Sequence, residues 1–111
     1  MNEVKNKKFD LEERLIDFAV LVIEITESLF DTRAGNHIAG QLVRSGTSPA
    51  LNYGEAQSAE SRNDFIHKMK ISCKELRETL NCLRLINKKK WFPENELTQL
   101  LDENNQLIQF L

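Results

Sequence analysis

Apolar residues recur at steps of three and four along most of the chain, and polar or turn-forming stretches separate the repeats. This spacing places apolar side chains on one face of an α helix. The pattern predicts four helices, over about residues 10–30, 36–58, 62–87 and 93–111. Because short loops make neighbouring helices antiparallel, we expect an all-α protein, an antiparallel up-down four-helix bundle formed by the single domain 1–111.

The first of these helices has apolar residues on two sides. One stripe faces the expected core and consists of Leu11, Leu15, Phe18, Val22, Ile25 and Leu29. A second stripe, further around the helix, consists of Ile16, Val20, Ile23 and Phe30. Together they cover roughly 200° of the helix surface, about twice what one core-facing side needs. In so small a chain we expect the second stripe to contact another copy, which predicts a homo-oligomer.

The helix expected over residues 36–58 contains residues that disfavour a helix. Gly40, Gly46 and Pro49 lie inside it, and an interior proline costs about 3 kcal/mol because it removes a backbone hydrogen bond. The apolar residues nevertheless fall on one side at helical spacing: Ile38, Leu42, Pro49, Tyr53 and Ala56. We interpret the segment as one helix kinked near Pro49, and a break into two helices is the alternative.

A polar stripe runs along the same helix within roughly 80° of arc. It consists of Gln41, Arg44, Ser48, Asn52 and Glu55. Arg44 and Glu55 are about three turns apart, so each needs a partner on another helix. Ser72 and Glu75 on the following helix are candidates. The stripe is either a solvated face or a polar network that fixes helix register or contacts a partner. The network interpretation predicts that Arg44→Ala or Glu55→Ala lowers the melting temperature or breaks the oligomer.

A basic stripe lies on the third helix, also within about 80° of arc. It consists of Lys70, Lys74, Arg77, Arg84 and Lys88. Nucleic-acid phosphates could bind there, although no interleaved aromatic residue offers a surface for base stacking. Acidic residues on the first helix offer a complement: Glu13, Asp17 and Glu24. Pairing between subunits and a solvated face are therefore the alternatives.

Composition and motifs limit the functional classes. The formal net charge is −2 and the pI is about 5.7, which argues against a protein whose whole surface binds nucleic acid. The sequence has no nucleophile motif, no Gly-rich phosphate loop and no metal-ligand spacing around His37 or His67. We therefore expect no catalysis, no cofactor, no metal and no small-molecule substrate.

Other features favour the cytoplasm. Cys73 and Cys82 are about 13 Å apart on one predicted helix, beyond disulfide reach, so we expect two reduced thiols. Residues 1–10 are polar and Lys-rich, without the apolar region of a secretion signal. The longest nearly uncharged apolar run, residues 18–25, is too short to span a bilayer, so we expect no membrane contact.

The stretch from Gln41 to Glu55 resembles a known family. The four-helix-bundle proteins called 23S rRNA intervening-sequence proteins, or S23 ribosomal proteins, have the approximate pattern Q-L-R-R-[SA]-x-x-S-I-x-x-N-I-x-E-G. This chain matches it at Gln41, Leu42, Arg44, Ser45, Ser48, Asn52 and Glu55. A later set fits the family's S-x-x-[DE]-F and S-x-x-E-L patterns: Ser61, Arg62, Phe65, Ser72, Glu75 and Leu76. The chain departs from the pattern at Val43, Pro49 and Ala56, and the likeness covers about Phe9 to Phe92.

The resemblance implies a bundle that assembles into a ring, typically a homopentamer. The family's genes were first noticed inside insertions in large-subunit rRNA genes, which is a genomic location and not an activity. Related accessory proteins of diversity-generating retroelements bind a reverse transcriptase and nucleic acid through a strongly basic ring. Two hypotheses follow. Net charge favours a non-enzymatic, self-assembling scaffold or adaptor for another macromolecule, and family history favours an RNA-binding protein linked to rRNA or a retroelement.

Overall fold

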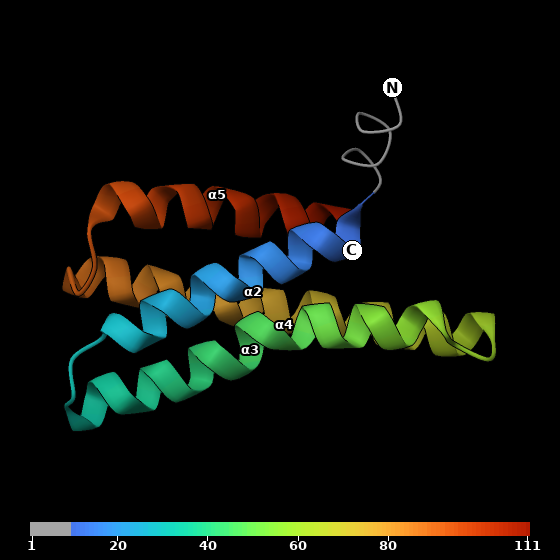
Figure 1. Ribbon diagram of the computed structural model, residues 1–111, viewed down its shortest axis with the longest axis horizontal. Coiled ribbons are helices and arrows are strands. Elements are labelled where there is room, and N and C mark those ends of the chain that lie inside the picture. Colours follow the sequence, from blue (N-terminus) through green and yellow to red (C-terminus); the bar gives the residue numbers. More distant parts are fainter. Residues whose placement is uncertain (1–9) are drawn as a thin grey trace.

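The structure is a computed structural model that describes residues 10–111, which form four α helices and no strand. The helices are α2 (Leu11–Ser28), α3 (Arg33–Gln57), α4 (Arg62–Lys89) and α5 (Glu94–Phe110). Figure 1 shows that consecutive helices run in opposite directions. The prediction of an all-α, four-helix fold is therefore confirmed. Residues 1–9, which include most of the expected Lys-rich segment, lie outside the described residues.

The first three of these helices begin at side chains that satisfy free backbone N–H groups. Asp10, Thr32 and Ser61 each accept a hydrogen bond from the backbone N–H three residues later, at 3.0 Å in all three cases. Pro93 precedes α5, which has acidic residues in its first turn, where the helix dipole favours them. Helix α4 ends at Lys90, whose backbone is left-handed at φ 57°.

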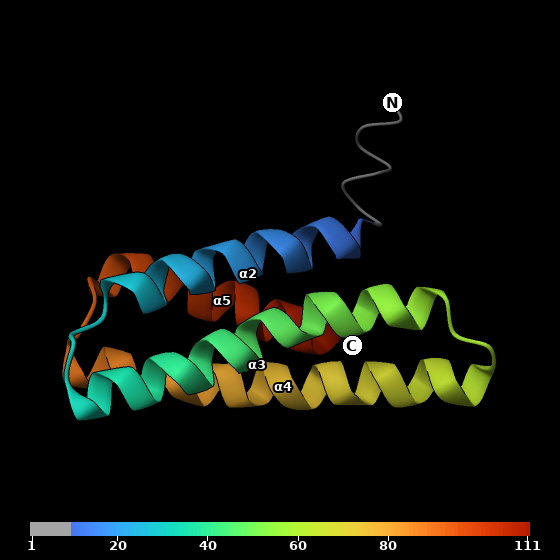
Figure 2. The same cartoon turned by 60° about the horizontal axis from the view of Figure 1, so that its bottom comes forward.

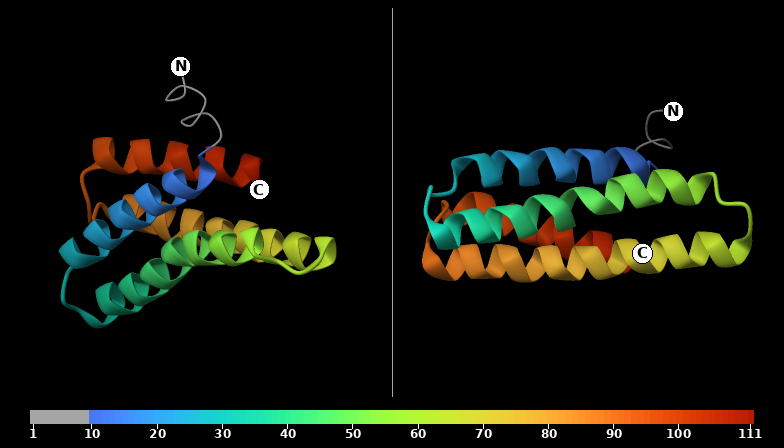
Figure 3. Two further views of the ribbon diagram at one scale, coloured as in Figure 1. Left: turned by 45° about the vertical axis from the view of Figure 1, so that its right-hand side comes forward. Right: turned by 90° about the horizontal axis from the view of Figure 1, so that it is seen from below.

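Pro49 does not break α3. The helix continues through it, and the proline ring is buried on the core side. Figure 3 shows that the ribbon of α3 bends along its length, in agreement with a kinked helix. The alternative of two separate helices is therefore not realised. A few residues earlier, Gly46 lets α3 approach α2 closely, because an added Cβ would lie 2.6 Å from Val22 Cγ1.

One apolar core lies between the helices. Its buried members are Leu15, Phe18, Val22, Ile25, Leu42, Leu76, Cys82, Leu83, Ile86, Leu97, Leu100 and Leu107. Among neighbouring helices, α3 and α4 pack over the greatest length, whereas α2 and α5 contact each other least. Helices α3 and α4 have 25 and 28 residues against 18 and 17 in α2 and α5. The end of the α3–α4 hairpin therefore extends beyond the other two helices (Figure 2). No helix within residues 10–111 is long and apolar enough to cross a membrane.

Candidate functional site

Arg44 forms the centre of a charged cluster between α3 and α4. Its Nη1 donates to both carboxylate oxygens of Glu75, at 2.9 and 3.1 Å. Its Nη2 donates to Glu78 and, at 3.3 Å, to Gln41 Oε1. The hydrogen bond to Glu78 is the largest cause that raises the pKa of the Arg44 guanidinium above its usual value, followed by Glu75. The Arg44 guanidinium of α3 lies between two carboxylates that are one turn apart on α4. Both ion pairs can form at once in only one register of the two helices.

The other residues of the polar stripe make separate contacts. Asn52 Nδ2 donates to Ser48 Oγ at 2.8 Å within α3. Glu55 accepts a hydrogen bond from Lys68 Nζ of α4 at 2.7 Å, and this carboxylate raises the pKa of Lys68. Ser72 is buried, and its hydroxyl donates to the backbone carbonyl of Lys68 in its own helix. The structure thus brings Gln41, Arg44 and Glu75 together, but it leaves Ser48, Asn52, Glu55 and Ser72 outside that cluster.

Each charged contact of the stripe has at least one exposed partner, although the Glu75 side chain is only 17% exposed. The side chain of Arg44 is 49% exposed and that of Glu55 is 61% exposed. The expectation that loss of either residue lowers stability assumed a buried charge pair, and this assumption does not hold within the protomer. Ion pairs at such exposure contribute little to stability, because water screens them.

Buried polar contacts lie beneath this surface, and sequence reasoning missed them. The hydroxyls of Ser45 and Thr79 are fully buried and share a hydrogen bond of 2.9 Å between α3 and α4. In the amide orientation that satisfies both of its groups, Asn104 of α5 donates to Leu76 O at 3.0 Å and accepts from Leu80 N at 3.2 Å. A signal for this contact was present, because Asn104 interrupts an otherwise apolar stripe in the last helix.

The basic stripe lies on the outside of α4. All five of its residues are exposed: Lys70, Lys74, Arg77, Arg84 and Lys88. Within residues 10–111 none of them forms an ion pair. The acidic residues of α2 that could complement the stripe therefore do not neutralise it inside one protomer.

The second apolar stripe of α2 lies outside the core, as its position on the helix predicts. Its four predicted residues are all exposed: Ile16, Val20, Ile23 and Phe30. The expected helix to residue 30 ends at Ser28, so Phe30 lies beyond α2. The Phe30 ring meets Trp91 edge-on with ring centroids 6.4 Å apart, so this residue has a partner within the protomer. Several exposed large apolar side chains at helical spacing on one helix are typical of an interaction site.

Comparisons with known proteins agree with these features. The family model for the 23S rRNA-intervening sequence protein matches residues 7–111. A solved structure from Bacteroides thetaiotaomicron VPI-5482, described as a protein with unknown function from the S23 ribosomal protein family, is 27% identical to this chain. The match covers 90% of this chain and 93% of that chain, with a TM-score of 0.84. The comparison with curated proteins finds no match.

Proposed function

The chain belongs to the 23S rRNA-intervening sequence protein family, and we propose that it is a non-enzymatic, self-assembling protein that acts as a scaffold or adaptor. The observation that carries the proposal is the exposed apolar stripe of α2, since a stripe of this length is costly to leave in water. Its occupant is a second copy of the chain. A closed ring, with five copies as the family resemblance implies, would give every stripe a partner without open ends. We place this assembly in the cytoplasm.

The wild-type chain should have a mass several times its 12.9 kDa in solution, as measured by light scattering at micromolar concentration. Val20→Glu should lower the mass to that of a monomer or small species, because it puts a carboxylate into the apolar contact. Leu85→Glu is the matched control, since Leu85 on α4 is 46% exposed and Val20 is 47% exposed. A wild-type mass near that of one chain would contradict the proposal.

Binding of structured RNA is the second candidate function, and the five exposed cations of the α4 stripe, which form no ion pair within residues 10–111, favour it. Reversing the charges of Lys70, Lys74 and Arg77 together should abolish binding without unfolding the protein. Gel-shift titrations at two salt concentrations measure this, because phosphate contacts give a steep salt dependence. A control variant with equal charge change reverses three exposed cations outside the stripe: Arg33, Arg62 and Lys89. If the wild-type protein binds no RNA in low salt, this candidate is excluded.

A further inference from the structure

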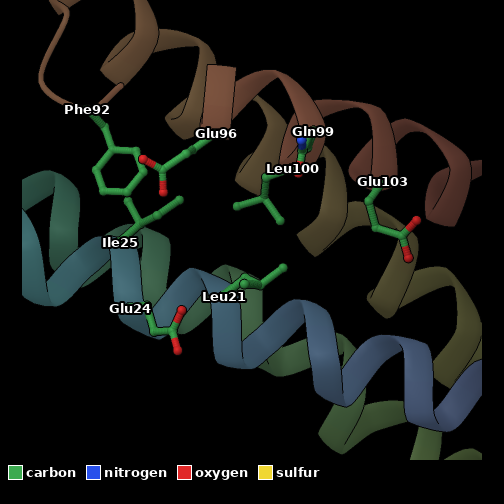
Figure 4. Close-up of a pocket in the computed structure, with 8 residues that line it drawn as sticks. All are labelled: Leu21, Glu24, Ile25, Phe92, Glu96, Gln99, Leu100 and Glu103. Atoms are coloured by element: carbon green, nitrogen blue, oxygen red, sulfur yellow. The ribbon is translucent and has the colours of Figure 1, made fainter. Parts of the chain in front are cut away.

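A groove of about 330 Å³ opens between α2 and α5, where neighbouring helices contact each other least. Its floor is apolar, because Ile25 and Leu100 are buried core residues that line it. Figure 4 shows Leu21 of α2 and Leu100 of α5 directed into the space between the helices. Leu21 is 48% exposed, so an apolar surface within the groove is open to solvent.

Contacts between elements limit the groove at both ends. At one end Arg14 of α2 donates to Glu103 of α5 from Nε at 3.1 Å and from Nη2 at 2.7 Å. The ring of Phe110 lies 5.0 Å from the same guanidinium. At the other end Phe30 packs against Trp91. The α5 residues that line the groove run from Glu96 to Glu103, about 10 Å or two turns of a helix.

The rim of the groove is acidic. Glu24, Glu96 and Glu103 line it together with the apolar residues (Figure 4), and none of its lining residues in the described part of the chain is basic. Glu103 is paired with Arg14, whereas Glu24 and Glu96 form no ion pair within residues 10–111. The complement of such a surface has apolar side chains flanked by cations. A nucleic acid or an anionic membrane would be repelled.

We propose that this groove binds an amphipathic helix of a partner protein, along about two of its turns. Its apolar side chains contact Leu21 and Leu100, and its Lys or Arg side chains lie beside Glu24 and Glu96. An amphipathic helix lying in a groove between two helices is a recurrent mode of recognition. The proposal rests on the scaffold function, and it assigns partner binding to the groove between α2 and α5, whereas Ile16, Val20 and Ile23 of α2 contact another copy.

The probes are two fluorescent peptides of about 12 residues, which exceeds the two helical turns that the groove spans. Both carry leucines at helical spacing on one face, and their flanking positions are lysines in one peptide and glutamates in the other. Fluorescence anisotropy should show at least about tenfold tighter binding of the lysine peptide to the wild-type protein. Leu21→Lys should weaken this binding by about tenfold or more, because it fills the groove with a like charge. Leu85→Lys, at an equally exposed leucine outside the groove, should leave it unchanged.

Two double variants test whether the acidic rim of the groove selects the lysine peptide. Glu24→Gln with Glu96→Gln should reduce the preference for the lysine peptide, whereas Glu27→Gln with Glu94→Gln removes equal charge from the same two helices outside the groove. Equal binding of the two peptides, or equal effects of the paired variants, would overturn the proposal.

Light scattering of the wild type and of every variant distinguishes the groove proposal from the self-assembly proposal. A wild-type chain that assembles but leaves the lysine peptide unbound overturns the groove proposal alone. A monomeric chain that binds the peptide overturns the self-assembly proposal alone. If Leu21→Lys lowers the oligomer mass, the groove is a contact between copies and not a partner site.

Discussion

Asn104→Asp should destabilise the protein by about 4 kcal/mol at pH 7 and by very little at pH 4. Asn104 is fully buried, and its amide donates to Leu76 O and accepts from Leu80 N. A protonated aspartic acid reproduces both hydrogen bonds, since its hydroxyl can donate and its other oxygen can accept. An ionised one loses the donor and buries a charge.

The sign of the pH dependence follows from burial. Burial raises the pKa of the introduced carboxyl in the folded state, so the folded protein keeps a proton that the unfolded chain releases. The folded variant therefore keeps its full stability at pH values below the ordinary pKa of aspartic acid. It loses stability as the pH rises above that pKa. Each pH unit between about 4 and 7 costs about 1.4 kcal/mol, which gives the stated total.

Urea unfolding of variant and wild type at the same two pH values measures this difference. Asn105→Asp is the matched control, because Asn105 is the exposed neighbour on the same helix and should show almost no change. An equal loss of stability at both pH values would show that the Asn104 side chain does not bond the α4 backbone.

Gly46→Ala should destabilise the protein by about 1–3 kcal/mol, the usual range for overpacking a core. The sign is opposite to helix propensity, which favours alanine over glycine by about 1 kcal/mol. The added Cβ would lie 2.6 Å from Val22 Cγ1 and 2.9 Å from Val22 Cγ2. Val22 is fully buried and branched at Cβ, so it cannot rotate out of the way and the helices must separate.

Two further variants isolate this cause, with chemical denaturation as the measurement. Val22→Ala in the Gly46→Ala background should recover part of the lost stability, because it removes the methyl groups that clash. Gly40→Ala lies in the same helix with no atom within 4 Å of its Cβ, and it should raise stability by up to about 1 kcal/mol. A similar effect of both glycine substitutions would rule out close packing against Val22 as the reason.

Local sequence patterns account for most of the fold. Periodicity located the helices, and the predicted start of the third helix at residue 62 agrees with α4, which begins directly after the Ser61 cap. The beginning of α3 differs, because this helix was expected to begin at about residue 36 and begins at Arg33. Thr32 caps the helix instead, and Gly35 lies inside its first turn. Glycine is required there by a close approach, since an added Cβ would lie 2.2 Å from Phe30 O. A close approach between backbone segments leaves no periodic signal.

The candidate site was less predictable because it depends on how the helices are rotated. Glu75 was a candidate partner of Arg44 because it is polar and lies on the next helix. Glu78 was missed, since only the rotation of α4 brings both carboxylates to one guanidinium. The exposure of the Arg44–Glu75 pair depends on which other helices cover the contact between α3 and α4. The position of a residue around its own helix does not predict this. The same holds for Leu21, whose exposure reflects the gap between α2 and α5.

The overhanging end of the α3–α4 hairpin divides the protein into regions of unequal local stability. Along most of their length α3 and α4 have α2 and α5 as further neighbours. Beyond the ends of those helices, each has only the other among the four helices that the structure describes. Opening of the backbone at the tip exposes little buried surface, so it costs less free energy than opening of the four-helix region. The tip can therefore open and close many times during the life of one folded molecule, while the core that holds α2 and α5 stays closed.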